Sequence, residues 1–167
     1  FKNIILYWSH LNKTKLGSFN AHLVNDLLTG LHAKHIHASS AKPFDISKLK
    51  STNQDKQHYS VVNVKPLRIS LGNKKLLYIE PLEIGATRNY YAFIPLGPPQ
   101  AICALEGDLV NTKNNKILWR YHTNVIVPVK GEWDQEPNYP NFTKALHKAL
   151  HLCRKEMVDN FLYASNS

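Results

Sequence analysis

The chain has 167 residues, of which 43% are hydrophobic and 20% charged, and this composition excludes a disordered tail, a collagen and a coiled coil. The formal net charge is +9, from 21 Lys and Arg against 12 Asp and Glu, which favours anionic partners such as nucleic acid, anionic lipid or an acidic protein face. Only four of the basic residues are arginine, which argues against base-specific recognition of nucleic acid.

The first third of the chain predicts a β-α-β arrangement. Residues 4–8 form a short apolar run that is typical of a strand covered on both faces. Ser18 is a suitable N-cap for the helix that follows, and Gly30 suits its end. Residues 35–38 predict a second strand, and the polar residues 39–57 predict a surface connection. The apolar residues that recur with helical spacing are Phe19, Leu23, Leu27, Leu28 and Leu31.

The middle of the chain predicts a mostly antiparallel sheet. The clearest hairpin has arms at residues 101–110 and 116–127, joined by a turn at 111–115 that is rich in asparagine. Asparagine tolerates the left-handed backbone that such turns need. Four further segments have the apolar pattern of strands, and they are residues 59–64, 67–71, 76–79 and 89–94.

The end of the chain predicts a loop over residues 128–140 and then a long amphipathic helix that begins near Pro140. Its apolar side comprises Phe142, Leu146, Ala149, Leu150, Cys153, Met157 and Phe161. Its opposite side is basic and comprises His147, Lys148, His151, Arg154 and Lys155. The loop before it carries two aromatic residues, Trp133 and Tyr139.

No motif predicts a catalytic or metal centre. His147 and His151 are spaced for a shared metal, but Lys148 stands where the H-E-x-x-H motif has its glutamate, and a lysine repels a dication. Cys103 and Cys153 lie in apolar surroundings, where thiols behave as small hydrophobic side chains, and their spacing leaves a disulfide open. Nucleotide-binding loops and a nucleophile elbow are absent from the sequence. A second histidine cluster, at His32, His35 and His37, has no nearby ligand to complete a metal site.

The start of the chain resembles the first loop of flavodoxin-like quinone reductases. The resemblance covers the strand at 4–8, His10 and the helix start Ser18-Phe19-Asn20. In that family this loop holds the flavin phosphate with backbone N–H groups and the helix N-terminus. The resemblance implies FMN as a cofactor, with His10, Ser18, Phe19 and Asn20 as its contacts, and an oxidoreductase as the alternative function.

A second resemblance covers more of the chain. The order strand, helix, strand, hairpin and terminal helix is similar to that of bacterial envelope lipoproteins of the curli-secretion, penicillin-binding-protein-activator and transporter-auxiliary type. Their hairpin typically reads D-x-x-[ST]-G-K-x-L-W, and the hairpin at residues 109–119 resembles it, with Asn115 in place of the glycine. Asparagine still permits the positive φ of the turn. The resemblance implies a non-enzymatic scaffold that binds other envelope proteins and can form homo-oligomers.

We therefore expect one α+β domain over residues 1–167, a mostly antiparallel sheet with two main helices packed on it. The expected function is a periplasmic protein-binding module of an envelope assembly, a secretion or a transport system. We expect it to be anchored to the outer membrane by lipid on a cysteine upstream of Phe1, and to use no cofactor or metal. The second alternative, after the flavin enzyme, is a non-specific nucleic-acid binder. The partner-binding residues that we expect are Lys148, His151, Arg154, Lys155, Trp133 and Tyr139.

Overall fold

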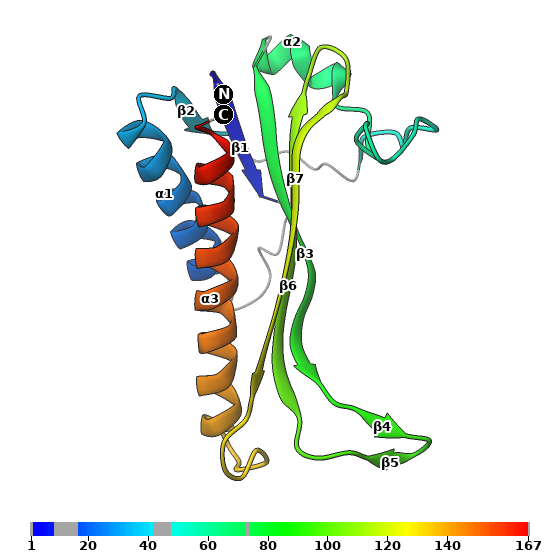
Figure 1. Cartoon of the computed structure of the whole chain (residues 1–167), viewed down its shortest axis with the longest axis vertical. Coiled ribbons are helices and arrows are strands. Elements are labelled where there is room, and N and C mark those ends of the chain that lie inside the picture. Colours follow the sequence, from blue (N-terminus) through cyan, green and yellow to red (C-terminus); the bar gives the residue numbers. More distant parts are fainter. Residues whose placement is uncertain (1, 9–16, 42–47, 73, 167) are drawn as a thin grey trace. The chain divides into compact units, whose positions relative to one another are not determined.

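The computed structural model describes residues 2–8, 17–41, 48–72 and 74–166 (Figure 1). It confirms the α+β class, with a five-stranded sheet of order β2-β1-β3-β6-β7 and a separate two-stranded sheet, β4-β5. The strands are β1 (Ile4–Trp8), β2 (Ala38–Ser40), β3 (Lys75–Thr87), β4 (Tyr90–Tyr91), β5 (Ile94–Pro95), β6 (Gln100–Asn111) and β7 (Ile117–Pro128). The helices are α1 (Gly17–Ala33), the 3-10 turn η2 (Lys65–Leu67), α2 (Arg68–Leu71) and α3 (Pro140–Ala164).

Two compact units share these elements. The first unit comprises Phe1–Glu80, Glu106–Tyr121 and Val158–Ser167, and the second comprises Pro81–Leu105 and His122–Met157. Strands β3, β6 and β7 and helix α3 each contribute to both units.

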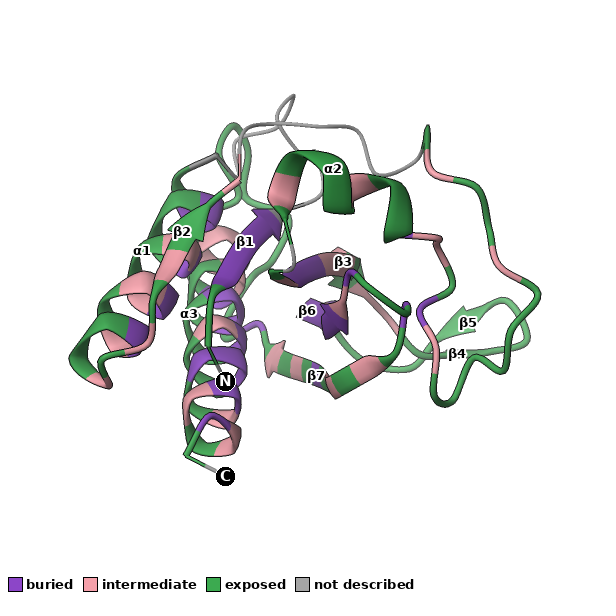
Figure 2. Cartoon of the chain, turned by 90° about the horizontal axis from the view of Figure 1, so that it is seen from above, coloured by how far each residue is buried: buried purple, intermediate pink, exposed green. Residues whose placement is uncertain are grey.

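In the first unit, β1 lies between β2 and β3 and is parallel to both. Ile4 is paired with Ala38 on one side, and Leu6 is paired with Leu77 on the other. Residues 4–7 are all buried, as Figure 2 shows for β1. A strand that is covered on both faces has a continuous apolar sequence. The strand predicted at residues 4–8 is therefore confirmed.

Gly30 does not end its helix, contrary to the prediction, because α1 continues to Ala33. A Cβ at Gly30 would lie 2.3 Å from Cδ1 of Leu162 in α3. The missing side chain therefore lets the last turns of α3 approach α1 within the first unit. The buried residues Leu23, Leu27 and Leu31 form the inner face of α1.

The second strand of the predicted β-α-β start is present as β2, but it begins at Ala38 and not at residue 35. Three turn hydrogen bonds follow the end of α1, including one from the N–H of Ile36 to the carbonyl of Leu31. His35 has φ 57°, the left-handed backbone typical of a helix exit. The chain becomes extended only at Ala38, so β2 begins where this turn is complete.

A core cluster of the first unit contains Ile5, Tyr7, Val64, Leu76, Tyr78 and Val110. Leu67 and Leu71 pack against it from η2 and α2, while Ile69 between them is exposed. Leu67 and Leu71 are four residues apart, which places them on the same face of a helix. Pro66 lies in the first turn of η2. The strand predicted at 67–71 is therefore wrong. Residues 59–64 form only two isolated bridges, Ser51 with Val62 and Tyr59 with Lys116, instead of the predicted strand.

The hairpin of β6 and β7 confirms the prediction for residues 101–127, with Asn115 at φ 67° in its turn. In the second unit, residues 101–105 of β6 are all buried, as are Ala145, Ala149 and Cys153 of α3. The Cys153 thiol donates to the carbonyl of Cys103 at 3.1 Å. Both cysteines are free thiols without solvent exposure.

The single strand predicted at residues 89–94 is wrong, since the chain reverses within it. Ala92 adopts φ 51°, and the reversal pairs Tyr91 with Ile94 and Tyr90 with Pro95. The result is the hairpin β4-β5, between the end of β3 and the start of β6 (Figure 1). The aromatic residues of this segment predict a single strand, but the left-handed backbone at Ala92 divides it into the two strands of a hairpin.

Candidate binding surface

Four basic residues form a stripe along α3 in the second unit, and we call Lys144, Lys148, His151 and Lys155 the basic stripe. Their spacing of four, three and four positions places them on one face of the helix, and all four are exposed. The structure thus brings together three of the predicted partner-binding residues and adds Lys144. Arg154 is half-buried beside the stripe.

Trp133 and Tyr139 lie in the loop before α3, and each is about two-fifths exposed, at 38% and 40%. The guanidinium of Arg88 lies 5.8 Å from the centroid of the Trp133 ring, within the range of a cation–π contact. Arg88 Nε also donates to the carbonyl of Gly97 at 2.8 Å. Trp133 is therefore attached to the base of the β4-β5 hairpin, whereas Tyr139 contacts Glu136 of its own loop.

The β4-β5 hairpin exposes apolar side chains on both faces and at its tip. Paired residues of a hairpin point to one face, so Tyr91 and Ile94 occupy one face and Tyr90 and Pro95 the other. Phe93 at the tip is 98% exposed. Between Glu83 and Glu106 the sole charged residue is Arg88. We call the exposed residues Tyr90, Tyr91, Phe93, Ile94 and Leu96 the apolar hairpin.

Sequence analysis missed this feature, because an apolar run in a predicted strand is assigned to the core by default. A signal was present in the Gly97-Pro98-Pro99 sequence directly after it. Proline cannot join the ladder of a central strand, so such a segment is poorly suited to a buried position. An exposed cluster of large apolar side chains marks an interaction site in most soluble proteins.

A buried charged network occupies the first unit. The Asp108 carboxylate accepts hydrogen bonds from Arg120 Nε (2.6 Å), Arg120 Nη2 (2.7 Å) and the Tyr78 hydroxyl (2.9 Å). Arg120 Nη1 donates to the carbonyl of Lys56 at 2.9 Å, and the Ser60 hydroxyl lies 3.1 Å from that of Tyr78. Burial and the nearby Asp108 raise the pKa of Tyr78, while the hydrogen bond to Asp108 raises that of Arg120. The network connects β3, β6 and β7. Its charged groups are paired with one another, so it presents no free acid or base.

Glu80 lies beside this network and gives a pH-dependent prediction. Burial, followed by repulsion from Glu106 and Asp108, raises its pKa above the ordinary 4.5. A carboxylate with a raised folded-state pKa stabilises the fold most at low pH and loses that contribution as pH rises through the folded pKa. Glu80→Gln should therefore raise the urea midpoint at about pH 7 and leave it unchanged at about pH 4. An equal gain at both pH values would contradict this origin.

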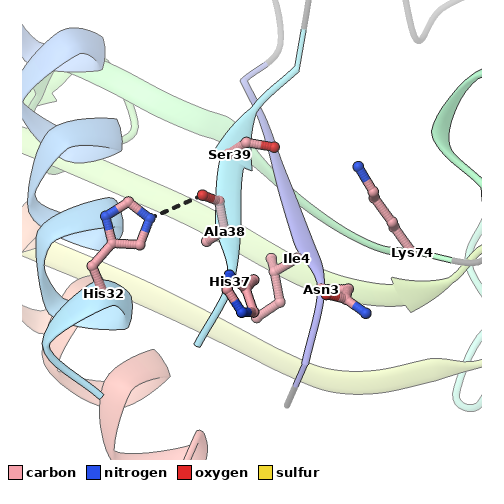
Figure 3. Close-up of a pocket in the computed structure, with 7 residues that line it drawn as sticks. All are labelled: Asn3, Ile4, His32, His37, Ala38, Ser39 and Lys74. Atoms are coloured by element: carbon pink, nitrogen blue, oxygen red, sulfur yellow. Dashed lines mark hydrogen bonds between the residues drawn. The ribbon is translucent and has the colours of Figure 1, made fainter. Parts of the chain in front are cut away.

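The histidine clusters form no metal site in the described residues, where no group of three His, Cys, Asp or Glu side chains could hold an ion. Figure 3 shows the pocket beside β2, where His32 points to the carbonyl of Ala38 at 3.0 Å and His37 lies apart from it. His147 and His151 are exposed on α3.

The residues implied as flavin contacts do not share one surface. Ser18 is exposed, whereas Phe19 and Asn20 are buried in the first turn of α1. The Asn20 amide makes no hydrogen bond to other described residues. His10 lies outside the described part of the chain.

No protein-family model and no curated protein matches the sequence. Among solved structures, the hypothetical protein CT253 from Chlamydia trachomatis is similar over 100% of both chains, with 12% identity and a TM-score of 0.51. Lipoprotein GNA1162 from Neisseria meningitidis is also similar over 100% of both chains, with 15% identity and a TM-score of 0.45. Protein XCC0632 from Xanthomonas campestris, with 16% identity and a TM-score of 0.42, matches 55% of this chain, which covers 48% of that protein.

The structural neighbours thus include bacterial lipoproteins, and the likeness to CT253 concerns the fold alone. None of the helices in the described ranges has the length and apolar character needed to cross a membrane.

Proposed function

We propose that this protein is a non-enzymatic binding module of a bacterial envelope assembly, and that the apolar hairpin docks onto a partner protein. The observation that carries the proposal is the exposure of five large apolar side chains on one hairpin, three on its strands, Phe93 in its turn and Leu96 directly after β5. Aromatic residues of this kind are common anchors at protein interfaces. The cation–π contact of Arg88 with Trp133 supports the base of the hairpin and adds a predicted partner-binding residue to it.

A protein suits this hairpin better than the interior of a lipid layer. A two-stranded sheet leaves the outer backbone groups of both strands without a ladder partner. In hydrocarbon such groups would remain unpaired at a cost of several kcal/mol each. A protein can supply backbone groups for them, as in strand addition to a sheet edge, together with pockets for Tyr91 and Phe93.

We include the basic stripe of α3 in the proposed interface, together with the apolar hairpin as the docking element. Lys148, His151 and Lys155 would contact acidic side chains at the rim of the interface, with Arg154 beside them. Rim charges mainly affect the rate of association and its salt dependence. The periplasmic location and a lipid anchor follow from the resemblance in the hairpin and in the order of elements, and they belong to the proposal.

The test is photo-crosslinking of the full chain in its native cells. A photoreactive residue at Phe93 should give one discrete adduct with an envelope protein, identified by mass spectrometry. The matched control is Ile69 of α2, an isolated apolar side chain that is 95% exposed, and it should give none. Adducts with lipid only, with a second copy only, or equally from both positions would overturn the proposal.

Binding of the identified partner then measures the contribution of each residue. Phe93→Ser should weaken it about 30-fold or more, since an interface anchor contributes about 2 kcal/mol or more. Lys155→Glu should lower the association rate with a smaller effect on dissociation. Unchanged affinity of Phe93→Ser would remove the hairpin from the interface.

A further inference from the structure

A cavity of about 300 Å³ lies in the second unit, where the end of β7 meets the start of α3. Three lysines line it, Lys130 from the loop after β7 and Lys144 and Lys148 from α3, with Asn141 beside them. Val127 and Ala145 contribute an apolar wall. Neither the apolar hairpin nor Trp133 lines this cavity.

The three lysines make no ion pair with other described residues. No carboxylate lines the cavity, and no ion pair or hydrogen bond joins these ammonium groups to other described residues. The first turn of α3 carries no acidic residue. Like charges around one cavity repel each other, so the arrangement is less favourable empty than with an anion inside it.

The backbone around the cavity is fixed by specific contacts. Asn141 Nδ2 donates to the carbonyl of Glu132 at 2.7 Å, which holds the loop after Lys130 against the start of α3. Gly131 has φ 82°, and a Cβ there would lie 3.2 Å from Asn141 Nδ2. Lys144 and Lys148 are one helical turn apart on the same face. The positions from which the three lysines extend are therefore set before any ligand binds.

We infer that this cavity binds a phosphoryl group, either free phosphate or pyrophosphate or the phosphate of a lipid headgroup. Three ammonium groups match an anion that carries more than one charge or several acceptor oxygens, because each ammonium offers three donors. A single carboxylate would leave most of these donors unused. No aromatic or arginine side chain lines the cavity, which disfavours a stacked nucleic-acid base.

The test measures binding of two probes to the full chain. Calorimetry uses inorganic pyrophosphate, and co-sedimentation compares vesicles of phosphatidylcholine with vesicles that also contain phosphatidylglycerol. Binding of pyrophosphate would assign a free phosphoryl ligand, and binding of the phosphatidylglycerol vesicles alone would assign a lipid headgroup. Either result supports the inference, provided that the variants below behave as expected.

The triple variant K130Q/K144Q/K148Q should weaken binding at least about tenfold, since the loss of even one charge-assisted hydrogen bond lowers affinity by about that factor. The control K50Q/K65Q/K113Q removes three positive charges from exposed positions outside the cavity and should bind as the unmodified chain does. If the triple variant does not fold, K144Q/K148Q replaces it. Equal losses in variant and control, or no binding of either probe, would overturn the inference.

Phe93→Ser should leave phosphoryl binding unchanged, because the apolar hairpin does not line the cavity. Failure of the phosphoryl site and failure of the docking proposal are therefore separate outcomes.

Discussion

Replacing Arg120 by leucine is expected to lower the free energy of unfolding by about 3–5 kcal/mol, the usual effect of breaking a buried ion pair. Asp108 has no solvent exposure, and Arg120 supplies two of the three hydrogen bonds that its carboxylate accepts. Without Arg120, the Tyr78 hydroxyl would be the one hydrogen-bond donor to this buried carboxylate that remains among the described residues. Urea denaturation followed by far-ultraviolet circular dichroism measures the difference.

The control for this prediction removes the charge of Asp108 as well. Asp108→Asn in the Arg120→Leu background should recover part of the lost stability, because an amide is cheaper to bury unpaired than an ion. Arg120→Lys should fall between the unmodified chain and Arg120→Leu, since lysine keeps the charge but not the two parallel donors. If the Asn variant and its parent unfold at the same urea concentration, the uncompensated charge is not the cause.

The elements with a strong repeating pattern could be predicted from the sequence. Three segments carry a local pattern that the folded structure retains. They are the continuous apolar run at residues 4–8, the helical spacing from Phe19 to Leu31 and the amphipathic sequence of α3. The asparagine-rich turn at 111–115 also carries its own signal, because few residues other than glycine and asparagine tolerate φ near 67°.

The segments that failed are short, and neighbouring structure decides their conformation. Leu67 and Leu71 pack on a cluster formed by β1, β3, β6 and Val64, and no local sequence pattern contains these contacts. The reversal at Ala92 depends on a left-handed residue that composition does not mark. Both errors assigned strands where apolar residues were dense, although density alone does not distinguish a core strand from a helix turn or an exposed hairpin.

Of the candidate binding surface, only the exposed basic residues of α3 could be predicted from the sequence. The helical wheel correctly places Lys148, His151 and Lys155 on an exposed face, because exposure of lysine follows from the period of α3. The pairing of Asp108 with Arg120, and of Arg88 with Trp133, needs the register of one segment against another. Contacts of this kind arise from the fold and cannot be read from spacing.

Asn115→Gly is expected to lower the free energy of unfolding by about 2 kcal/mol, although the resembling lipoproteins have glycine at this turn position. Asn115 is fully buried, and its Oδ1 accepts from the N–H of Val64 at 2.9 Å. Its Nδ2 donates to the carbonyl of Ser60 at 3.1 Å. Glycine would fit φ 67° as well, but it would leave the buried Val64 N–H without this acceptor.

The matched control for this prediction is Asn114→Gly at the neighbouring position of the same turn. Asn114 is exposed, and within the described part of the chain its side chain accepts from the N–H of Lys116 alone, at 3.1 Å, so its loss should shift the urea midpoint much less. The carbonyl of Ser60 keeps a second donor in Thr52 Oγ1, at 2.8 Å, which places most of the expected loss on Val64. If both variants lost equal stability, backbone entropy of the turn would explain the effect. A larger loss for Asn115→Gly would mean that Asn115 fastens the segment at residues 60–64 to the hairpin as well as forming its turn.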